Sequence, residues 1–318
     1  MLKKIGVLTS GGDSSGMNAA VRAVVRSGIA NGMEVCGISD GYLGLCQGRI
    51  QLMQPHDVSD ILNRGGTILG TSRFPAFKEE SVREAGIASL RKFGIEGLIV
   101  IGGNGSYQGA RLLSAAGMPC IGIPGTIDND TPGSDFSIGF STALSTVVEC
   151  IDRLRDTATS HKRITIVEIM GRHCGDLALY ASIACGCEAV IVPEHEFSLD
   201  DILASMDRAI KAGKRSAIIS LCENVTDIGE LTRAIEAHTG FETRATVLGH
   251  IVRGGVPTAF DRVLGSRLGA YAVDLLRTGM GGRMVGVHKG DLVNYDFSDE
   301  DSRLHFDEKL YQLSALLV

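Results

Sequence analysis

The sequence has no apolar run long enough to cross a membrane. A membrane-spanning helix needs about 18 or more consecutive apolar residues, whereas here the 44% of hydrophobic residues are spread along 318 positions. The start also lacks the apolar stretch and cleavage site of a secretory signal, because Ile5 to Thr9 already has the composition of a strand that leads into a glycine-rich turn. We therefore expect a cytoplasmic protein that has no membrane partner.

Disulfide and zinc-binding patterns are missing as well. The eight cysteines are scattered, only Cys185 and Cys187 are close together, and no CxxC or HxxxH spacing occurs. The cysteines are therefore expected to be small buried hydrophobes, and no zinc site is expected. The net charge of −6 and the lack of a basic cluster argue against nucleic acid as the main partner. Phosphate ligands stay open, because they need only local positive charge.

Neither common nucleotide-binding glycine motif is present, yet the chain has 41 glycines, many of them where a strand should end. The expected strand Ile5 to Thr9 runs into SGGDSSG at 10–16, and a helix is expected from Met17 to about Ile29. The turn is neither a Walker A loop nor GxGxxG. A strand, a glycine turn and a helix in this order nevertheless present free backbone N–H groups to an anion, which favours a phosphate-binding turn over a bare tight turn.

A second unit of this kind and an acidic turn follow. The apolar strand Gly97 to Ile101 runs into GGNGS at 102–106, with a helix expected from Tyr107, and the next strand, Cys120 to Ile123, ends at PGTIDND, 124–130. Ligands of open α/β sheets bind at the carboxyl ends of the strands. We therefore expect both glycine turns and PGTIDND to meet in one crevice.

The two carboxylates of PGTIDND, Asp128 and Asp130, stand two positions apart. One can accept a proton from an attacking hydroxyl while the other lies near a metal that bridges phosphates. The alternative is a loop in which Asp and Asn only form Asx-turns. The nearby glycine turns favour the first interpretation.

Expected strands and helices alternate almost throughout, with no low-complexity linker. This pattern predicts a doubly wound α/β chain, folded as two similar three-layer αβα lobes with mostly parallel sheets and a boundary near Gly139. Exceptions to the alternation are a turn at Gly41 to Gly44 and a short helix at His56 to Asn63. A C-terminal helix is expected from about Asp301.

Six segments occur in an order that resembles bacterial-type 6-phosphofructokinase. They are GGDSSGMN at 11–18, GGNGS at 102–106, PGTIDND at 124–130, SHKR at 160–163, MGR at 170–172 and LGHIVRGG at 248–255. The resemblance covers nearly the whole chain. It implies a homotetramer that transfers the γ-phosphoryl of ATP to the 1-hydroxyl of fructose 6-phosphate with Mg²⁺, giving fructose 1,6-bisphosphate and ADP in glycolysis. It also implies a nucleotide-binding lobe, 1–138 plus about 252–300, and a sugar-phosphate-binding lobe, 139–251 plus about 301–318.

The resemblance assigns roles to individual residues. The catalytic group would be Asp128 as general base, with Thr126, Asp130, Arg172 and Gly12. ATP would be held by Gly12, Arg73, Phe74, Gly103, Asn104, Gly105 and Ser106. The sugar phosphate would be held by Thr126, Ile127, Asp128, Met170, Gly171, Arg172, Glu223, His250, Ile251, Val252 and Arg253, with Arg163 and Arg244 from a neighbouring subunit. The metal would be held by Asp130 and by residue 104, which is Asn104 where the family usually has Asp.

The resemblance also implies an effector site for ADP or phosphoenolpyruvate at a subunit interface. Its residues would be Arg22, Arg26, Asp60, Arg155, Gly186, Cys187, Glu188, Lys214 and Arg215. Pro55, Ala212 and Ser216 stand where a regulated member usually carries basic residues. Because fewer cations bind an anion more weakly, we expect blunted regulation.

Other functions stay open at this point. Asn104 would suit a regulatory or binding subunit that has lost catalysis, although Asp128 and Asp130 argue against it. A pyrophosphate-dependent relative is the other alternative, but that branch typically has Asp at position 105 and Lys at 125. Both are glycine here, which leaves room for ATP. Taken without the resemblance, Arg163 and Arg244 could be plain strand-edge charges and His250 a capping or core histidine.

Overall fold

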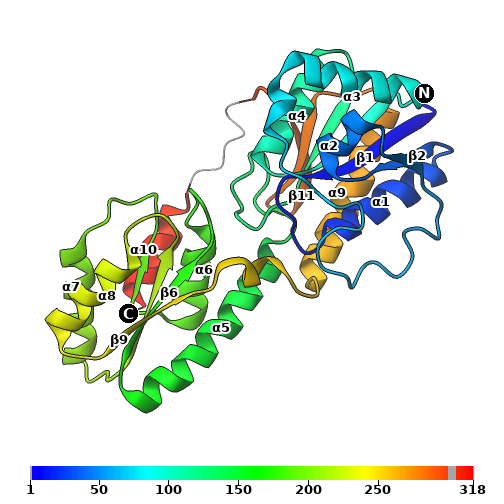
Figure 1. Cartoon of the computed structure of the whole chain (residues 1–318). Helices are drawn as coiled ribbons and strands as arrows, with labels where there is room; N and C mark the ends of the chain where they lie inside the picture. The colour runs from blue at the N-terminus through cyan, green and yellow to red at the C-terminus, as the bar shows by residue number, and fades with distance from the viewer. Residues whose placement is uncertain (1, 300–305, 318) are drawn as a thin grey trace. The chain divides into compact units, whose positions relative to one another are not determined.

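The structure, a computed structural model, describes residues 2–299 and 306–317. The chain forms two compact units (Figure 1). Unit 1 comprises Met1–Thr142 and Arg253–Leu304, and unit 2 comprises Ala143–Val252 and His305–Val318. Within the described part of the chain, no helix combines the length and the apolar character that crossing a membrane requires.

Unit 1 is built on a seven-stranded sheet in the order β11-β10-β5-β4-β1-β2-β3. Its strands are β1 Lys4–Ser10, β2 Glu34–Ile38, β3 Ile50–Leu52, β4 Gly97–Gly102, β5 Cys120–Pro124, β10 Arg283–His288 and β11 Asp291–Asp296. The five central strands are parallel, and β3 and β11 are antiparallel edges. The chain runs from β1 out to β3 and returns to β4 on the other side of β1. The strand order therefore reverses between β1 and β4.

Helices cover both faces of this sheet. Helices α1 (Met17–Ala30) and α9 (Ala259–Arg277) contribute to the core on one face, while α2 (Gly41–Gln47), α3 (Glu80–Lys92) and α4 (Asn104–Ala115) contribute to the core on the other. Strands buried on both faces must be apolar throughout, which explains the unbroken hydrophobic run of β4. The five central strands and their helices thus form a three-layer αβα unit.

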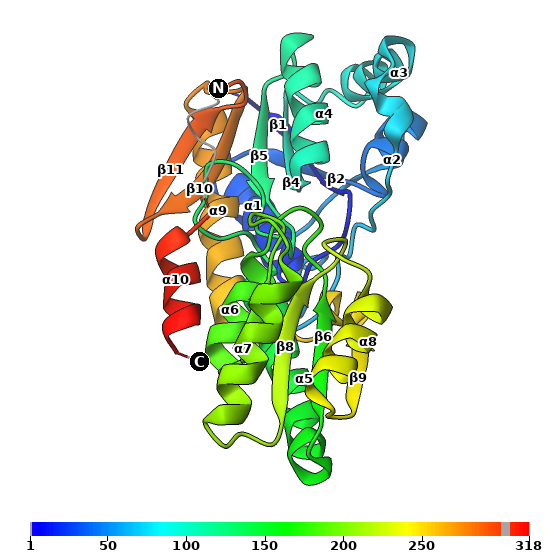
Figure 2. The ribbon, with the colours of Figure 1, turned by 90° about the vertical axis from the view of Figure 1, so that its left-hand side faces the viewer.

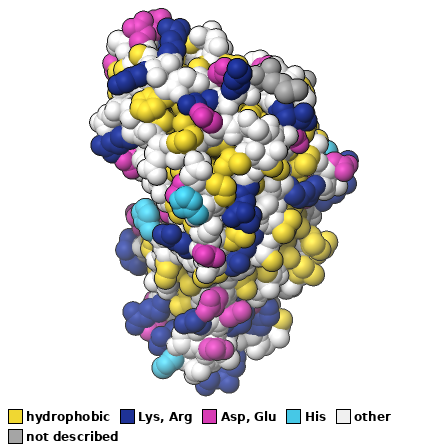
Figure 3. Space-filling view, turned by 90° about the vertical axis from the view of Figure 1, so that its right-hand side faces the viewer, with side chains coloured by type: hydrophobic (Ala, Val, Ile, Leu, Met, Phe, Trp, Pro, Cys, Tyr) yellow, Lys and Arg dark blue, Asp and Glu magenta, His cyan; other side chains and the backbone are white. Residues whose placement is uncertain are grey.

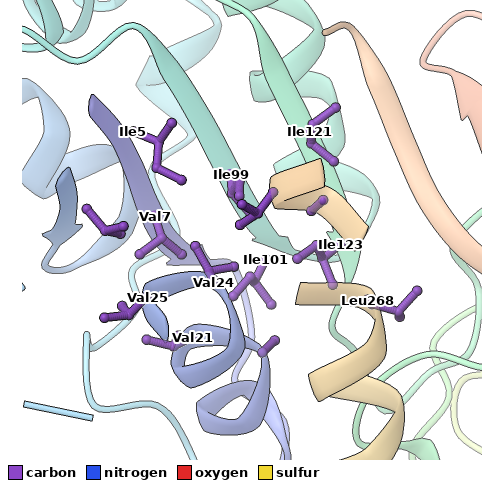
Figure 4. Close-up of a cluster of buried hydrophobic side chains, with 14 of the residues drawn as sticks. Ile5, Val7, Val21, Val24, Val25, Ile99, Ile101, Ile121, Ile123 and Leu268 are labelled. Atoms are coloured by element: carbon purple, nitrogen blue, oxygen red, sulfur yellow. The ribbon is translucent and has the colours of Figure 1, made fainter. Parts of the chain in front are cut away.

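Alternation along the central strands produces the larger core. The side chains of β1, β4 and β5 that share one face meet Val21, Val24 and Val25 of α1 and Leu268 of α9 (Figure 4). Gly265 lets α9 approach α1 closely, because a Cβ added there would lie 3.0 Å from the carbonyl oxygen of Gly16. Close backbone approach is a common reason for glycine in a helix.

Unit 2 repeats this layering on a smaller, wholly parallel sheet in the order β7-β8-β6-β9. Its strands are β6 Ile164–Ile169, β7 Ala189–Ile191, β8 Ala217–Cys222 and β9 Thr243–Val247, and its helices are α6 Asp176–Cys185, α7 Leu199–Lys211, α8 Ile228–Thr239 and α10 Glu308–Leu316. Helices α7 and α8 cover one face (Figure 2). Helix α6 lies against the other, where Ser220 of β8 donates to the carbonyl oxygen of Ala178 at 2.9 Å. Helix α5 (Phe140–His161) begins in unit 1 and continues into unit 2.

The predicted doubly wound α/β fold with mostly parallel sheets is confirmed, and three local predictions are wrong. Segment 41–44 opens helix α2, because Asp40 and Gly41 turn the chain with positive φ values of 58° and 61°. Segment 56–63 is a series of turns, and the positive φ of 55° at Asp60 interrupts any helix there. The helix after GGNGS begins at Asn104 instead of Tyr107. The C-terminal helix starts at Glu308, and Asp301 lies outside the described residues.

The surface mixes both signs of charge with apolar side chains. On the face shown in Figure 3, cationic and anionic side chains are interspersed and hydrophobic ones gather between them. Large exposed hydrophobic residues include Phe260 and Val263 on α9, and Val247 and Ile251 at the end of β9 and just after it. Among the cysteines, Cys36, Cys120, Cys187 and Cys222 are buried and the other four are half-buried, so the expectation of buried cysteines holds for half of them.

Candidate active site

The carboxyl ends of β1, β4 and β5 lie level with one another in the middle of the unit 1 sheet. Ser10 pairs with Gly102, and Gly102 pairs with Pro124. Helix α1 leaves β1 toward one face of the sheet, and α4 leaves β4 toward the other. Segments that diverge in this way at a reversal of strand order form the usual ligand site of open α/β sheets. The structure thus brings both glycine turns and PGTIDND together, as the sequence predicted.

Two helix N-termini point to this edge. Helix α1 follows Gly16, whose φ is 114°, and α4 follows Gly103. In the structure described, neither N-terminus has a side-chain cap or an acidic residue in its first turn. The first backbone N–H groups of a helix lack intrahelical partners and carry partial positive charge, so they attract anions. A Cβ added at Gly105 would meet no described atom within 4 Å, so the first turn of α4 is open to a ligand.

Ser106 connects these two strand ends. Its hydroxyl donates to the carbonyl oxygen of Ser10 at 2.9 Å, and its own carbonyl accepts from the hydroxyl of Tyr42 at 2.6 Å. Gly102 must be glycine here, because a Cβ would lie 2.4 Å from both Ser10 O and Ser106 Oγ. The Ser106 side chain is therefore part of the scaffold, and its backbone N–H donates to the carbonyl oxygen of Gly103 at 2.9 Å.

The loop after β5 is held by its own polar groups. Asp128 is 3% exposed, and its N–H donates to the Thr126 hydroxyl at 3.2 Å. Asn129 has a φ of 56°, accepts the N–H of Ser137 at 2.8 Å and donates to the carbonyl of Asp135 at 3.2 Å. The Asx-type role that the sequence left open thus describes Asn129. It fixes the loop that carries the two carboxylates.

Asn104 bridges the second glycine turn to this loop. Its side-chain amide donates to the carboxylate of Asp130 at 3.0 Å and to the carbonyl oxygen of Asp130 at 3.1 Å. A neutral donor therefore faces a carboxylate oxygen in this part of the site. A second carboxylate at position 104 would instead repel Asp130 unless a cation lay nearby.

The first glycine turn is covered by Arg253. A Cβ at Gly12 would lie 2.8 Å from Nη1 of Arg253, and the same nitrogen donates to the carbonyl of Asp13 at 3.2 Å. Arg253 was expected to bind sugar phosphate, and the structure places it in unit 1 beside the predicted ATP-binding Gly12. Of the other predicted ATP-binding residues, Arg73 is exposed and Phe74 packs half-buried against the core formed by α2, α3 and α4.

Sequence reasoning missed Asp261, a fully buried carboxylate on α9. It accepts hydrogen bonds from the N–H groups of Gly139 at 2.9 Å and Thr142 at 2.8 Å, and from the Thr142 and Thr258 hydroxyls. Burial raises the pKa of Asp261, against hydrogen bonds that lower it. The carboxylate thus caps the N-terminus of α5, which begins at Phe140. An acidic residue at 261, far from 140 in sequence, gives no local signal of this role.

In unit 2 the predicted sugar-binding residues lie at opposite ends of the parallel strands, some at the carboxyl ends and others at the amino ends. Met170, Gly171 and Arg172 follow the carboxyl end of β6, and Glu223 follows that of β8. Glu223 Oε1 accepts the N–H groups of Gly171 at 3.2 Å and Arg172 at 3.0 Å, which holds Arg172 at a positive φ of 58°. The other members follow β9, where His250 and Ile251 are exposed and Val252 is buried.

Arg163 and Arg244 lie at the amino edge of the same sheet. Arg163 precedes β6, and Arg244 is the second residue of β9. The six residues of β6 separate this edge from Met170 by roughly 20 Å at 3.3 Å per residue. Both arginines contact Glu242, which the sequence analysis did not single out. One copy of unit 2 therefore does not bring all its predicted sugar-binding residues together.

Three of the five cations predicted for the effector site, Arg26, Arg155 and Lys214, already have partners in the protein. Lys214 Nζ lies 2.9 Å from the buried Glu188 carboxylate, which also accepts the N–H of Ile218. Arg155 donates to the carbonyl of Cys185 at 2.6 Å, and Arg26 donates to the carbonyl of Pro55 at 3.2 Å. The rest of the predicted set comprises Arg22, half-buried on α1, Asp60, Gly186 and Arg215, all exposed, and Cys187, whose pKa burial raises to about 12.

Three level strand ends, two uncapped helix N-termini and a buried carboxylate are the features of a phosphate-binding α/β protein. A family model described as phosphofructokinase matches residues 4–276. The chain is 62% identical over 319 residues to ATP-dependent 6-phosphofructokinase of Tolumonas auensis, covering 100% of both. It is 57% identical over 299 residues to the protein of that name from Edwardsiella ictaluri, covering 94% of this chain and 93% of the relative. This chain belongs to the phosphofructokinase family.

Solved structures agree with this assignment. Phosphofructokinase from Saccharomyces cerevisiae matches with a TM-score of 0.88 at 34% identity, over 98% of this chain and 46% of that one, so this chain spans about half of the yeast chain. Pichia pastoris phosphofructokinase in the T-state matches with a TM-score of 0.90 at 34% identity, over 100% of this chain and 36% of that one. A pyrophosphate-dependent phosphofructokinase from Marinobacter aquaeolei, with a TM-score of 0.83 at 18% identity over 99% of this chain and 92% of that one, shares the fold.

Proposed function

We propose that this chain is an ATP-dependent 6-phosphofructokinase, which transfers the γ-phosphoryl of ATP to the 1-hydroxyl of fructose 6-phosphate. The observation that carries the proposal is the level arrangement of the β1, β4 and β5 ends, with two uncapped helix N-termini and buried Asp128 beside them. Phosphoryl transfer needs positioning and charge neutralisation more than covalent help. Fixed backbone N–H groups supply both.

In this proposal Asp128 takes the proton of the attacking hydroxyl. Its loop is fixed by Asn129 and Ser137, so the carboxylate keeps its position as the hydroxyl approaches. Thr126 and Gly12 line the same edge. The phosphates of ATP would lie on the N–H groups of Gly103, Asn104 and Gly105, in the turn that Ser106 holds. Arg73 and Phe74 would hold the rest of the nucleotide.

The residues at this edge fit Mg²⁺, a hard cation that prefers one or two carboxylates together with phosphate oxygens and water. Asp130 would hold it, with Asn104 beside it as a neutral and weaker partner. Among the described residues no group of three or more His, Cys, Asp or Glu side chains could form a protein-only cage, which agrees with a metal held largely by its substrate. When bound, the metal neutralises phosphate charge.

The sugar phosphate would be bound by unit 2 residues and completed by a neighbouring subunit in a homotetramer. The carboxyl edge would supply Met170 to Arg172, Glu223 and His250, whereas Arg163 and Arg244 lie at the opposite edge and would serve another subunit's site. Strand β9 supports this division, because it is a sheet edge and its neighbourhood exposes Val247 by 58% and Ile251 by 63%. Exposed apolar edges in natural proteins are commonly covered by another surface.

A coupled assay of ADP release tests the proposal. Purified protein with ATP, Mg²⁺ and fructose 6-phosphate should release ADP, and pyrophosphate in place of ATP should support no transfer. Gly125 supports ATP as the donor, because the pyrophosphate-dependent branch typically has Lys at this position. A Cβ at Gly125 would already lie 3.0 Å from Ile101 and from Met17, which leaves little space for a longer side chain. Transfer from pyrophosphate alone would overturn the donor assignment. Binding of fructose 6-phosphate without any transfer would identify a binding subunit.

A further inference from the structure

We propose that Glu242 is the resident counter-ion of an oxyanion site formed by Arg163 and Arg244, and that it competes with the incoming phosphate for both guanidinium groups. The identity of the ligand as a sugar phosphate rests on the proposed function. The competition itself rests only on the geometry of unit 2, at the amino edge of its sheet.

Glu242 bridges the two arginines with both of its oxygens. Oε1 accepts Nε of Arg244 at 2.8 Å and lies 2.5 Å from its Nη2, while Oε2 lies 3.3 Å from Nη2 of Arg163. The backbone fixes this arrangement, because the N–H of Ile164 donates to the carbonyl oxygen of Glu242 at 3.0 Å. The parallel register of β6 and β9 thus sets Glu242 beside Arg163, and Arg244 two residues further along the chain.

The Glu242 carboxylate leaves most N–H donors of Arg163 and Arg244 without a hydrogen bond to it. Each guanidinium carries five N–H donors, and Glu242 engages only a few of them. Arg163 Nε is buried and has no hydrogen-bond partner among the residues that the structure describes, although the side chain is 23% exposed. Arg244 is 65% exposed. Two cations and one carboxylate leave a net charge of +1 at a surface that a phosphate can reach.

Glu242 occupies the part of Arg244 that a phosphate would need. The Nε–Nη2 edge of a guanidinium is one of the forks that bind phosphate through two parallel hydrogen bonds, and here both nitrogens face Oε1. The hydrogen bond from Arg244 lowers the pKa of Glu242, and the charges of Arg163, Arg244 and His161 add to this. Glu242 therefore stays ionised near neutral pH and acts there as an internal competitor.

The test compares Glu242→Gln with the matched control Glu236→Gln, whose carboxylate accepts the N–H of Thr243 at 3.2 Å. Inorganic phosphate is titrated calorimetrically into the full-length protein, and the heat that Arg244→Ala removes defines this site. Glu242→Gln should tighten that phosphate binding roughly threefold or more, the scale of one or two exposed ion pairs, and Glu236→Gln should not. The double variant Glu242→Gln/Arg244→Ala should bind no better than Arg244→Ala.

Equal or weaker phosphate binding by Glu242→Gln would overturn the competition and make Glu242 a positioning residue. Glu242→Asp, which shortens the carboxylate by one methylene, should fall between parent and Gln and guards against a folding defect in one variant. With fructose 6-phosphate, Glu242→Gln should lower KM and leave kcat and the KM for ATP unchanged. If the parent transfers no phosphoryl group, the proposed function fails, while the phosphate titration still decides the role of Glu242.

Discussion

The carboxyl edge of the unit 1 sheet and the amino edge of the unit 2 sheet present positive charge in different ways. In unit 1 the helix N-termini after Gly16 and Gly103 present backbone N–H groups, and neutral side chains such as Asn104 and Ser106 hold the turns. In unit 2 the cations Arg163 and Arg244 share Glu242, and Lys214 is paired with Glu188.

This difference follows from the conformational entropy that each kind of group loses when it is held in one position. Backbone N–H groups are held by the fold, so they need no rotamer to be ordered when a ligand arrives. Long cationic side chains lose conformational entropy when they are fixed. At an exposed edge they pair with a carboxylate as long as no ligand is bound. Preorganised backbone suits the reacting phosphates, and exchangeable ion pairs suit a group that is bound and released.

The largest expected effect is at Asp128, the buried carboxylate of unit 1. Asp128→Asn should leave folding and sugar binding nearly intact and lower turnover by about 10² to 10⁴, the usual contribution of a general base. Asp135→Asn is the control, because the Asp135 carboxylate faces His288 and Lys289 at the β10–β11 turn and takes no part in the proposed chemistry. Steady-state kinetics measure the turnover of each variant. Turnover of Asp128→Asn within a few-fold of the parent would show that Asp128 is not the base.

The second prediction tests whether the two edges serve one site from two subunits. Arg244→Ala and Asp128→Asn should each be nearly inactive, yet hybrids made by unfolding and reassembling an equal mixture should recover activity. A hybrid pair contains one fully intact site, so random pairing gives roughly a quarter of the parent's activity. Separately reassembled variants are the control. No recovery, in hybrids whose size equals that of the parent, would show that Arg244 serves its own chain.

The third prediction concerns Asp261, whose carboxylate caps the N-terminus of α5, in contrast to the uncapped N-termini of α1 and α4. Its carboxylate faces donors only, so Asp261→Asn turns an amide N–H toward another N–H group and should lower the free energy of unfolding by about 2 to 3 kcal/mol. Asp274→Asn, on the same helix but 54% exposed, is the control and should cost less than about 0.5 kcal/mol. Urea unfolding followed by circular dichroism measures both. Equal effects would contradict the capping role.

The fourth prediction introduces charge into the neutral part of the unit 1 edge. Asn104→Asp removes the amide donor of Asp130, so Mg²⁺ should compensate the two carboxylates. We expect higher turnover and little change with fructose 6-phosphate. The Mg²⁺ requirement should fall roughly thirtyfold, because one added charge about 4 Å from a divalent cation in water contributes about 2 kcal/mol. Mg²⁺ should also raise the unfolding temperature of this variant more than that of the parent or of Asn104→Ala. Superimposable Mg²⁺ titrations would exclude a metal role for residue 104.

The smallest effect is expected from effectors at the cations of unit 2 and α1. Because Lys214, Arg155 and Arg26 already contact Glu188 or backbone carbonyls, ADP and phosphoenolpyruvate should shift the half-saturating fructose 6-phosphate concentration less than about fivefold, below the usual allosteric range. Saturation curves with and without each effector measure the shift. A hundredfold shift would show that Arg22, Arg26, Lys214 and Arg215 suffice for strong regulation.

The sequence by itself determined the parts of this protein that depend on neighbouring residues. A strand, a glycine turn and a helix are contiguous, so the turns after β1 and β4 and the acidic loop after β5 could be located, and alternation predicted the doubly wound sheet. Helix α2 was missed because Gly41 and Gly44 have the composition of a turn. Gly44 in fact lets the helix pass the carbonyl of Ser39, which a Cβ would meet at 1.7 Å.

Tertiary structure alone decided which polar groups met. Asn104 and Asp130 are separated by 26 positions, and Asp261 lies 119 positions from Thr142, so no local pattern predicts either contact. The bridge from Glu242 to Arg163 depends on β9 pairing with β6, and that register comes from the packing of the unit 2 sheet. Residue types and turns are local properties of a chain, whereas the partner of a charge is set by the strands and helices that the core brings together.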